Sequence, residues 1–141
     1  MENKEFNPSF FRFEDLRVYQ KALDYYIWVQ INTEMFPHSE SHPLVKSFVL
    51  DALEIAAKIS DGSSKNKTRF IDNLRDAITT IRRCIVYTSI SEKLSYFSEE
   101  QEESSRTELT ELTRMIGALI SSLQRERPNK NHKQETNYHN Y

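Results

Sequence analysis

Apolar side chains recur every three or four residues in four successive segments of this chain, and this spacing constrains the fold most strongly. Side chains spaced in this way line one face of an α-helix, whereas strands need an alternation with a period of two. The clearest stripe keeps heptad spacing for about five turns and consists of Ile71, Leu74, Ile78, Ile81, Ile85 and Thr88. Because the 141 residues include only 2 Gly and 4 Pro, few turns are available for a multi-stranded sheet. We therefore predict an all-α protein.

The other three segments carry stripes of the same kind. The first runs from Phe13 to near Pro37 and has two apolar surfaces side by side. The predicted inward surface is Leu16, Tyr19, Leu23, Tyr26 and Gln30, and the second is Val18, Ala22, Tyr25, Trp28 and Val29. The next segment carries Leu44, Phe48, Ala52, Ile55 and Ile59, and the last carries Leu109, Leu112, Ile116, Leu119 and Leu123.

Four positions in the sequence indicate where helices begin or end. Pro43 is expected at or near the first position of the second helix, where its missing N–H costs nothing. Gly62 is expected to end that helix in the left-handed conformation. Asn66 is predicted to cap the third helix. Ser98 and Gln101 match a capping box at the start of the fourth.

Short links between four amphipathic helices favour antiparallel neighbours, and hence an antiparallel up-down-up-down four-helix bundle. We expect an N-terminal arm over residues 1–12, the bundle over residues 13–126 and a polar tail over residues 127–141. This C-terminal tail is predicted to be disordered, because it has no aliphatic side chain whose burial would offset the entropy lost on ordering.

Charge and hydropathy exclude several classes of protein. A net charge of -2 argues against a protein that coats nucleic acid indiscriminately. No run approaches the roughly 18 apolar residues that span a bilayer, and the first residues lack the pattern of a signal peptide. A lone cysteine, Cys84, cannot form an internal disulfide. We expect a cytoplasmic protein without a membrane partner, in which Cys84 is a packed thiol.

Four motifs in the chain resemble those of a known family. Residues 11–22 read FRFEDLRVYQKA, residues 36–37 are Phe-Pro, residues 59–62 read ISDG and residues 92–100 read EKLSYFSEE. Together they resemble the small bacterial four-helix-bundle proteins encoded in intervening sequences of 23S ribosomal RNA genes. The resemblance covers about residues 11–124.

This resemblance implies a fold, an assembly and a set of partners. It implies an antiparallel bundle that assembles as a ring-shaped homopentamer, with no established enzymatic activity. The same type of bundle includes the accessory protein of diversity-generating retroelements, which binds a reverse transcriptase and nucleic acid through a basic surface.

One cluster of basic residues is a candidate for nucleic-acid contact. Residues 61–98 carry a net charge of +3, and the candidate contacts are Lys65, Lys67, Arg69, Arg75, Arg82 and Arg83. Copies of this cluster in a ring would form a band of charge able to meet several phosphates. The alternative is an ordinary solvated face, since Asp72 and Asp76 interleave with these cations at salt-bridge spacing. The sequence favours the solvated face.

Other chemistry finds little support in the sequence. His38 and His42 are four residues apart, but Pro37 and Pro43 interrupt the helix geometry that a shared metal ion would need. The aromatic residues near Trp28 are expected in the core or at a subunit interface. We assign no catalytic residue, cofactor, metal site or small-molecule substrate.

The first two helices are apolar beyond one stripe, so a monomer would expose a patch that demands a partner. The leading prediction is a non-catalytic, homo-oligomeric interaction scaffold. The second is a nucleic-acid-binding accessory protein that serves RNA or a retroelement reverse transcriptase. An enzyme is the weakest of the three interpretations.

Overall fold

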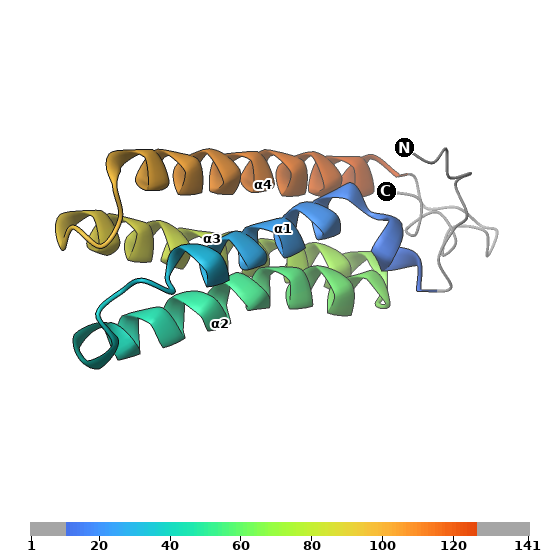
Figure 1. Ribbon diagram of the computed structural model, residues 1–141. Coiled ribbons are helices and arrows are strands. Elements are labelled where there is room, and N and C mark those ends of the chain that lie inside the picture. The colour runs from blue at the N-terminus through green and yellow to red at the C-terminus, as the bar shows by residue number, and fades with distance from the viewer. Residues whose placement is uncertain (1–10, 127–141) are drawn as a thin grey trace, which may run out of the picture.

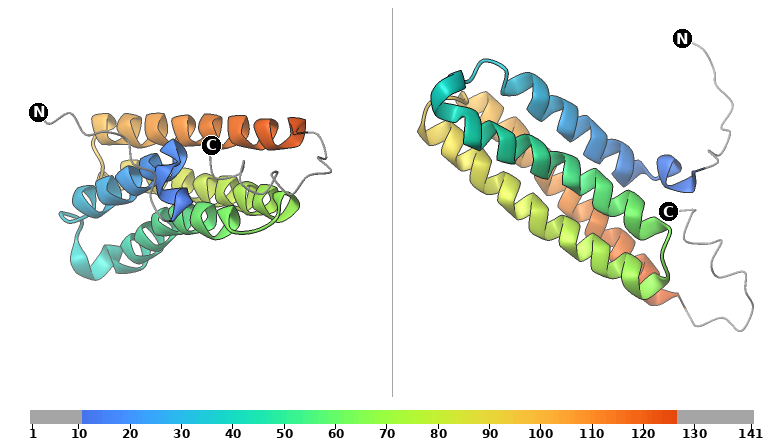
Figure 2. Two further views of the ribbon diagram at one scale, coloured as in Figure 1. Left: turned by 90° about the vertical axis from the view of Figure 1, so that its right-hand side faces the viewer. Right: turned by 90° about the horizontal axis from the view of Figure 1, so that it is seen from below.

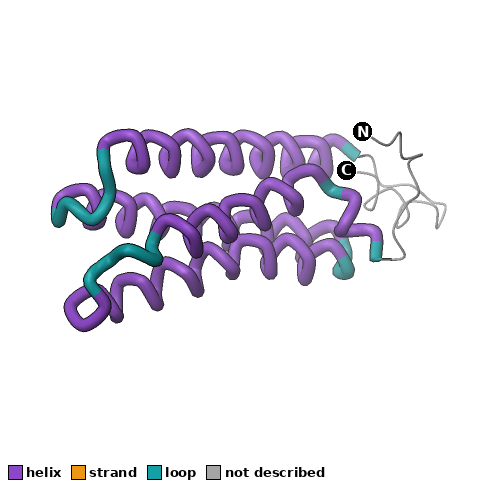
Figure 3. Tube along the Cα trace, viewed as in Figure 1, coloured by secondary structure: helices purple, strands orange, loops and turns teal. Residues whose placement is uncertain are grey.

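The computed structural model describes residues 11–126, apart from the side chains of residues 38–42. A 3-10 turn, η1 (Arg12–Asp15), precedes four α-helices: α1 (Arg17–Asn32), α2 (His38–Ser63), α3 (Lys67–Lys93) and α4 (Glu99–Arg125). Figure 3 shows that only short connections separate them. The predicted all-α class is confirmed. Residues 1–10 of the expected arm, and the whole expected tail, lie outside the described residues.

The helices form a bundle in which successive members run in opposite directions (Figure 1). α2 packs against α1 and α3, and α4 packs against α3 and α1. Seen from below in Figure 2, α2 lies between α1 and α3, with α4 behind them. α1 and α3 are therefore diagonal neighbours, and their outer sides point away from each other. None of these described helices is both long and apolar enough to cross a bilayer.

The predicted stripes of the last three helices form most of the core. On α4 all five stripe residues are buried, and on α2 the four from Phe48 to Ile59 are buried while Leu44 is half-buried. On α3 the buried stripe residues are Ile71, Leu74, Ile81 and Thr88. Cys84 is fully buried beside them, as predicted.

On α1 the prediction of the inward stripe is wrong. Apart from Leu16, which is buried at the helix start, the buried residues come from the second surface: Val18, Ala22, Tyr25 and Val29. Tyr19, Leu23 and Tyr26 are only half-buried, and Gln30 is exposed. The inward surface has the smaller side chains, and its one large member, Tyr25, finds a polar partner in the core.

Two helix starts also differ from the prediction. The first segment is divided at Leu16, whose extended backbone (φ -75°, ψ 126°) separates η1 from α1. The second helix begins at His38, directly after Pro37, so Pro43 lies inside it. At that position proline removes one backbone hydrogen bond, and the helix continues through it. The first segment ends earlier than predicted, at Asn32.

The two predicted N-terminal caps are confirmed. Asn66 Oδ1 accepts a hydrogen bond from the Arg69 backbone N–H at 3.0 Å. Ser98 Oγ accepts from the Gln101 backbone N–H at 3.1 Å, and Gln101 Oε1 accepts from the Ser98 backbone N–H at 2.8 Å. The capping box therefore satisfies two donors reciprocally where α4 begins.

An aromatic cluster closes the end of the bundle where the α1–α2 and α3–α4 connections lie. Phe97, from the α3–α4 connection, is buried with its ring centroid 5.5 Å from that of Trp28 and 5.3 Å from that of Phe36. Phe48 of α2 lies 6.0 Å away on another side. Trp28 also stacks on Tyr25, at 6.1 Å between centroids. Tyr25 thus lies in the core, and Trp28 and Tyr26 are half-buried against it.

Gly62 does not take the left-handed conformation that the sequence predicted. It lies within α2, and no described glycine has a positive φ. Its role is close approach: a Cβ at Gly62 would lie 2.7 Å from Asn73 Cβ and 2.9 Å from Phe70 Cδ1. The absence of a side chain is what lets the ends of α2 and α3 meet.

Gly62→Ala should therefore destabilise the bundle, whereas Gly117→Ala should not. The added methyl at Gly62 forces α3 away from α2, at a cost of about 1 to 3 kcal/mol of unfolding free energy. An added Cβ at Gly117 meets nothing within 4 Å, so that variant should gain about 0.5 to 1 kcal/mol from helix propensity. Denaturant melts followed by circular dichroism would measure both. Equal effects of the two substitutions would contradict the close approach.

Candidate interaction surfaces

The six basic residues predicted to contact nucleic acid lie along one end and one side of the α2–α3 pair. Lys65 is in the α2–α3 connection, and Lys67 is the first residue of α3. The four arginines (Arg69, Arg75, Arg82 and Arg83) are exposed on α3. Lys65 and the four arginines are exposed, and Lys67 is half-buried.

Four of the six have partners within the chain. Lys65 Nζ donates to Asn73 Oδ1 at 3.3 Å, and Lys67 Nζ donates to the Glu126 carbonyl oxygen at 2.7 Å. Arg75 Nη1 lies 4.0 Å from Asp72 Oδ1. Arg83 Nη1 lies 4.0 Å from Asp51 Oδ1. These contacts fit the solvated, salt-bridged alternative.

The remaining two, Arg69 and Arg82, form no ion pair within residues 11–126. Thirteen positions separate them, which places them about 20 Å apart along a helix. The structure therefore spreads the basic residues over α3 and does not gather them into one pocket.

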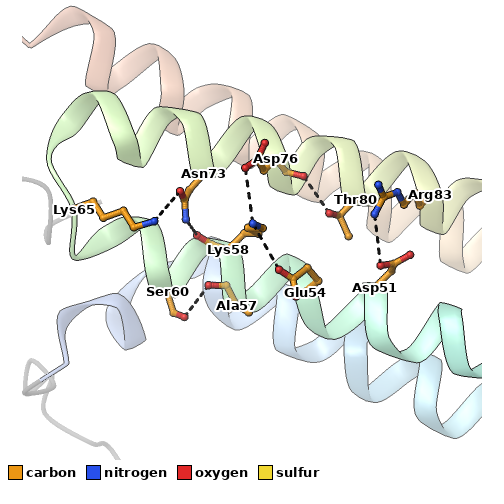
Figure 4. Close-up of polar contacts among 10 residues, drawn as sticks. All are labelled: Asp51, Glu54, Ala57, Lys58, Ser60, Lys65, Asn73, Asp76, Thr80 and Arg83. Carbon is orange, nitrogen blue, oxygen red and sulfur yellow. Dashed lines mark hydrogen bonds and ion pairs between the residues drawn. The ribbon is translucent and has the colours of Figure 1, made fainter.

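Several polar contacts that were not predicted from the sequence join α2 to α3 (Figure 4). Lys58 Nζ lies 3.8 Å from both Glu54 Oε1 and Asp76 Oδ2, and Asn73 Nδ2 donates to the Lys58 carbonyl oxygen at 3.2 Å. Asp76 thus pairs across the helices and not with an arginine of α3. The spacing of Glu54 and Lys58 was the only local signal, since the partner helix cannot be read from the sequence.

Asp51 of α2 receives two groups from α3. The Tyr87 hydroxyl donates to Asp51 Oδ2, and Arg83 faces the other carboxylate oxygen. Burial, together with this hydrogen bond and the charge of Asp51, raises the pKa of Tyr87 to about 12. Ionisation of Tyr87 beside Asp51 would place two negative charges in contact, so this tyrosine stays a hydrogen-bond donor.

A chain of buried hydroxyl groups crosses the core between three helices. Tyr25 of α1, Thr88 of α3 and Ser105 of α4 are fully buried. The Thr88 hydroxyl donates to the Cys84 carbonyl oxygen at 2.8 Å. Ser105 Oγ lies 2.7 Å from Thr88 Oγ1 and 2.8 Å from the Tyr25 hydroxyl.

The proton count assigns a direction to each of these hydrogen bonds. A hydroxyl group has one proton, and that of Thr88 is already donated to a carbonyl. Ser105 therefore donates to Thr88, and Tyr25 donates to Ser105. Each of these three hydroxyl groups donates its proton to an acceptor, and a buried polar group is tolerated only when it is hydrogen-bonded in this way.

The same burial suppresses ionisation in the core. Desolvation raises the pKa of Tyr25 far above its usual value, more than the nearby hydroxyl groups of Ser105 and Thr88 lower it. Desolvation and the charge of Asp51 raise the pKa of the Cys84 thiol to about 12. Since the thiolate is the reactive form of cysteine, Cys84 is protonated and inert at neutral pH.

Metal ligands do not converge in the part of the chain that the structure describes. No group of three or more His, Cys, Asp or Glu residues there could hold an ion. The side chains of His38 and His42 lie outside the described set.

Large apolar side chains remain exposed on two sides of the bundle. One set lies on and just after α1 and comprises Ile27, Ile31 and Met35, of which Met35 is 92% exposed. The other lies on α2 and α3 and comprises Leu50, Leu53, Val86 and Ile90. The surplus apolar surface that the sequence predicted on the first two helices is thus present, and it extends onto α3.

Comparison with known proteins identifies the family. The sequence model of the family described as 23S rRNA-intervening sequence protein matches residues 14–118, which include most of the bundle. The chain belongs to this family. The resemblance expected from the sequence motifs is confirmed.

A solved structure supports the same assignment of the fold. It is described as a protein of unknown function from the S23 ribosomal protein family of Bacteroides thetaiotaomicron, with a TM-score of 0.66 and 19% sequence identity. The match covers 78% of this chain and 98% of that chain. At this identity the likeness shows the shared fold alone. No curated protein sequence matches this chain.

The raised pKa values make this bundle sensitive to alkali. The folded state keeps the Cys84 and Tyr25 protons, whereas the unfolded chain loses them above their ordinary pKa values of 9.0 and 10.0. The folded state therefore binds more protons at these two groups, and their contribution to the unfolding free energy is constant below pH 9 and falls above it. The slope is about 1.4 kcal/mol per pH unit for each group.

Urea melts between pH 7 and 11 would measure this dependence. Cys84→Ala should reduce the slope from pH 9 upward, and Tyr25→Phe should reduce it from pH 10 upward. Val29→Ala is the control, because it removes apolar packing and should lower stability equally at every pH. An unchanged slope in both of the first two variants would refute the assignment.

Proposed function

We propose that this protein is a non-catalytic, homo-oligomeric scaffold that holds other macromolecules through its surface. The observation that carries the proposal is the pair of exposed apolar surfaces on a bundle whose buried hydroxyl groups of Tyr25, Thr88 and Ser105 are already hydrogen-bonded within the core. Soluble monomers rarely expose contiguous apolar patches larger than roughly a few hundred Å², and patches above that size mark sites of association. Ile31 is 60% exposed, and Leu50 and Val86 are each 54% exposed.

The chemistry of the described residues supports a non-catalytic role. Catalysis needs an acid or base and a nucleophile that converge in a pocket. In this bundle the groups with shifted pKa values are Tyr25, Cys84 and Tyr87, and each shift favours the protonated form. Two open grooves between helices contain paired charges, Lys21 with Glu108 in one and Lys58 with Asp76 in the other.

Self-association is the part of the proposal that can be tested directly. Light scattering of the full chain at micromolar concentration should give several times the monomer mass of 16.7 kDa. Five copies are expected from the family resemblance. A monomeric mass at this concentration would contradict the scaffold proposal, because the exposed apolar surfaces would then have no partner in the protein itself.

A second candidate is a nucleic-acid-binding accessory protein that serves RNA or a reverse transcriptase. Two exposed arginines without an ion-pair partner in residues 11–126, Arg69 and Arg82, favour it. In an oligomer these cations would repeat around the assembly and could contact several phosphates. The intramolecular pairing of the other four basic residues weighs against it.

Binding of labelled RNA across a salt series separates the two candidates. The scaffold proposal expects negligible binding at low salt. The accessory proposal expects an affinity that falls steeply with salt, and a smaller slope when Arg75, Arg82 and Arg83 become Ala. Arg114→Ala is the control, because Arg114 is equally exposed but lies on α4. Tight, salt-dependent binding that only the triple variant weakens would replace the scaffold with the accessory function.

A further inference from the structure

Two surfaces of this bundle complement each other in both hydropathy and charge. The α1 face consists of Asp24, Ile27, Ile31, Glu34 and Met35, and the α2–α3 face consists of Leu50, Leu53, Arg82, Val86 and Ile90. We propose that the α1 face of one copy docks on the α2–α3 face of a second copy. This inference rests on the proposed self-association and specifies which surfaces meet.

The α1 face is an apolar strip with an acidic border. Ile27 and Ile31 are one turn apart on the same side of α1, and Met35 follows just beyond the helix. Asp24 and Glu34 are exposed beside them. Neither carboxylate forms an ion pair among the residues that the structure describes. The two charges are therefore available to a partner.

The α2–α3 face combines four exposed apolar side chains with an exposed arginine. Val86 and Ile90 are one turn apart on α3, and Leu50 and Leu53 lie on the adjacent α2. The contacts of Asp51 with Tyr87 and Arg83 hold α2 beside α3 at this level. Arg82 is one turn before Val86, is exposed, and has no ion-pair partner in the described chain.

Charge decides which faces meet. Two α1 faces together would bring Asp24 and Glu34 of one copy against the same carboxylates of the other. Two α2–α3 faces together would likewise oppose their arginines. Like-charge contacts at an interface suppress wrong pairings, and opposite charges favour the right one. An α1 face against an α2–α3 face joins apolar to apolar and acidic to basic.

The position of the two faces makes the contact repeatable. Because α1 is diagonal to α3 in the bundle, one copy can engage a neighbour through each face at the same time. Such a head-to-tail contact builds a ring if the rotation between copies closes, and a filament if it does not. A contact between identical faces would stop at a dimer.

Complementary disruption tests the head-to-tail arrangement. One variant carries Ile27→Glu and Ile31→Glu, and the other carries Val86→Glu and Ile90→Glu. Each variant alone should be monomeric in light scattering, because one face of every contact is lost. A 1:1 mixture should form a heterodimer, because one intact α1 face and one intact α2–α3 face remain.

The control carries Thr110→Glu and Ser121→Glu, which add the same charge at exposed positions of α4. It should assemble like the unsubstituted chain. Circular dichroism checks that every variant keeps its helices. Assembly of either disrupted variant alone, or a mixture that stays monomeric, would overturn the inference.

Charge exchange provides a second test that leaves the apolar side chains in place. Asp24→Lys and Arg82→Glu should each raise the concentration for half-assembly by about tenfold, and neither disturbs an ion pair among residues 11–126. The two substitutions together should restore assembly to within about threefold, since the borders are again of opposite sign. Absence of any recovery in the double variant would contradict the charge pairing.

The outcomes separate this inference from the function on which it rests. If the unsubstituted chain is monomeric, the proposed self-association itself fails. If the unsubstituted chain assembles and the disrupted variants assemble equally well, self-association stands and only the assignment of these two faces fails.

Discussion

Burial of one apolar stripe from each helix against the other three is the interaction on which this structure depends. Each large aliphatic side chain that leaves water contributes about 1.5 to 3 kcal/mol. The stripes of α2, α3 and α4 supply such side chains at nearly every turn. The aromatic cluster around Phe97 extends the same burial to the end where the α1–α2 and α3–α4 connections meet. Without this core, no polar contact in the bundle would have a defined geometry.

Apolar stripes alone tolerate shifts of one helix along another, and polar and steric contacts remove that freedom here. The hydroxyl chain from Tyr25 through Ser105 to Thr88 is satisfied only when α1, α3 and α4 keep one register. The close approach at Gly62 sets the distance between α2 and α3 at one end. The contacts of Asp51 with Tyr87 and Arg83 fix the same pair further along. Specificity thus comes from a few contacts placed on a permissive core.

The buried and the exposed side chains of the bundle both bear on the proposed function. Cys84 is buried and held protonated, and Lys58 is paired with carboxylates at the surface. Large apolar side chains remain exposed on two sides of the bundle, and Asp24, Glu34 and Arg82 lie beside them without an ion pair among the described residues. Membership in the 23S rRNA-intervening sequence protein family agrees with a small helical bundle. In the function that we propose, these surfaces serve association.

The sequence by itself determined the helical class, the caps at Asn66 and Ser98, the inward stripes of three helices and the burial of Cys84. These depend on residues within one or two turns of each other, so local spacing and hydrogen-bonding chemistry suffice. Only the tertiary structure decided which stripe of α1 faces inward, because that helix has two apolar surfaces. The choice depends on the position of Ser105 on α4, which accepts the hydrogen bond of the Tyr25 hydroxyl. The tertiary structure also decided that Gly62 permits a close approach and that Lys58 and Arg83 find carboxylates on another helix. Such partners are distant in sequence, and they meet only once the core has brought the helices together.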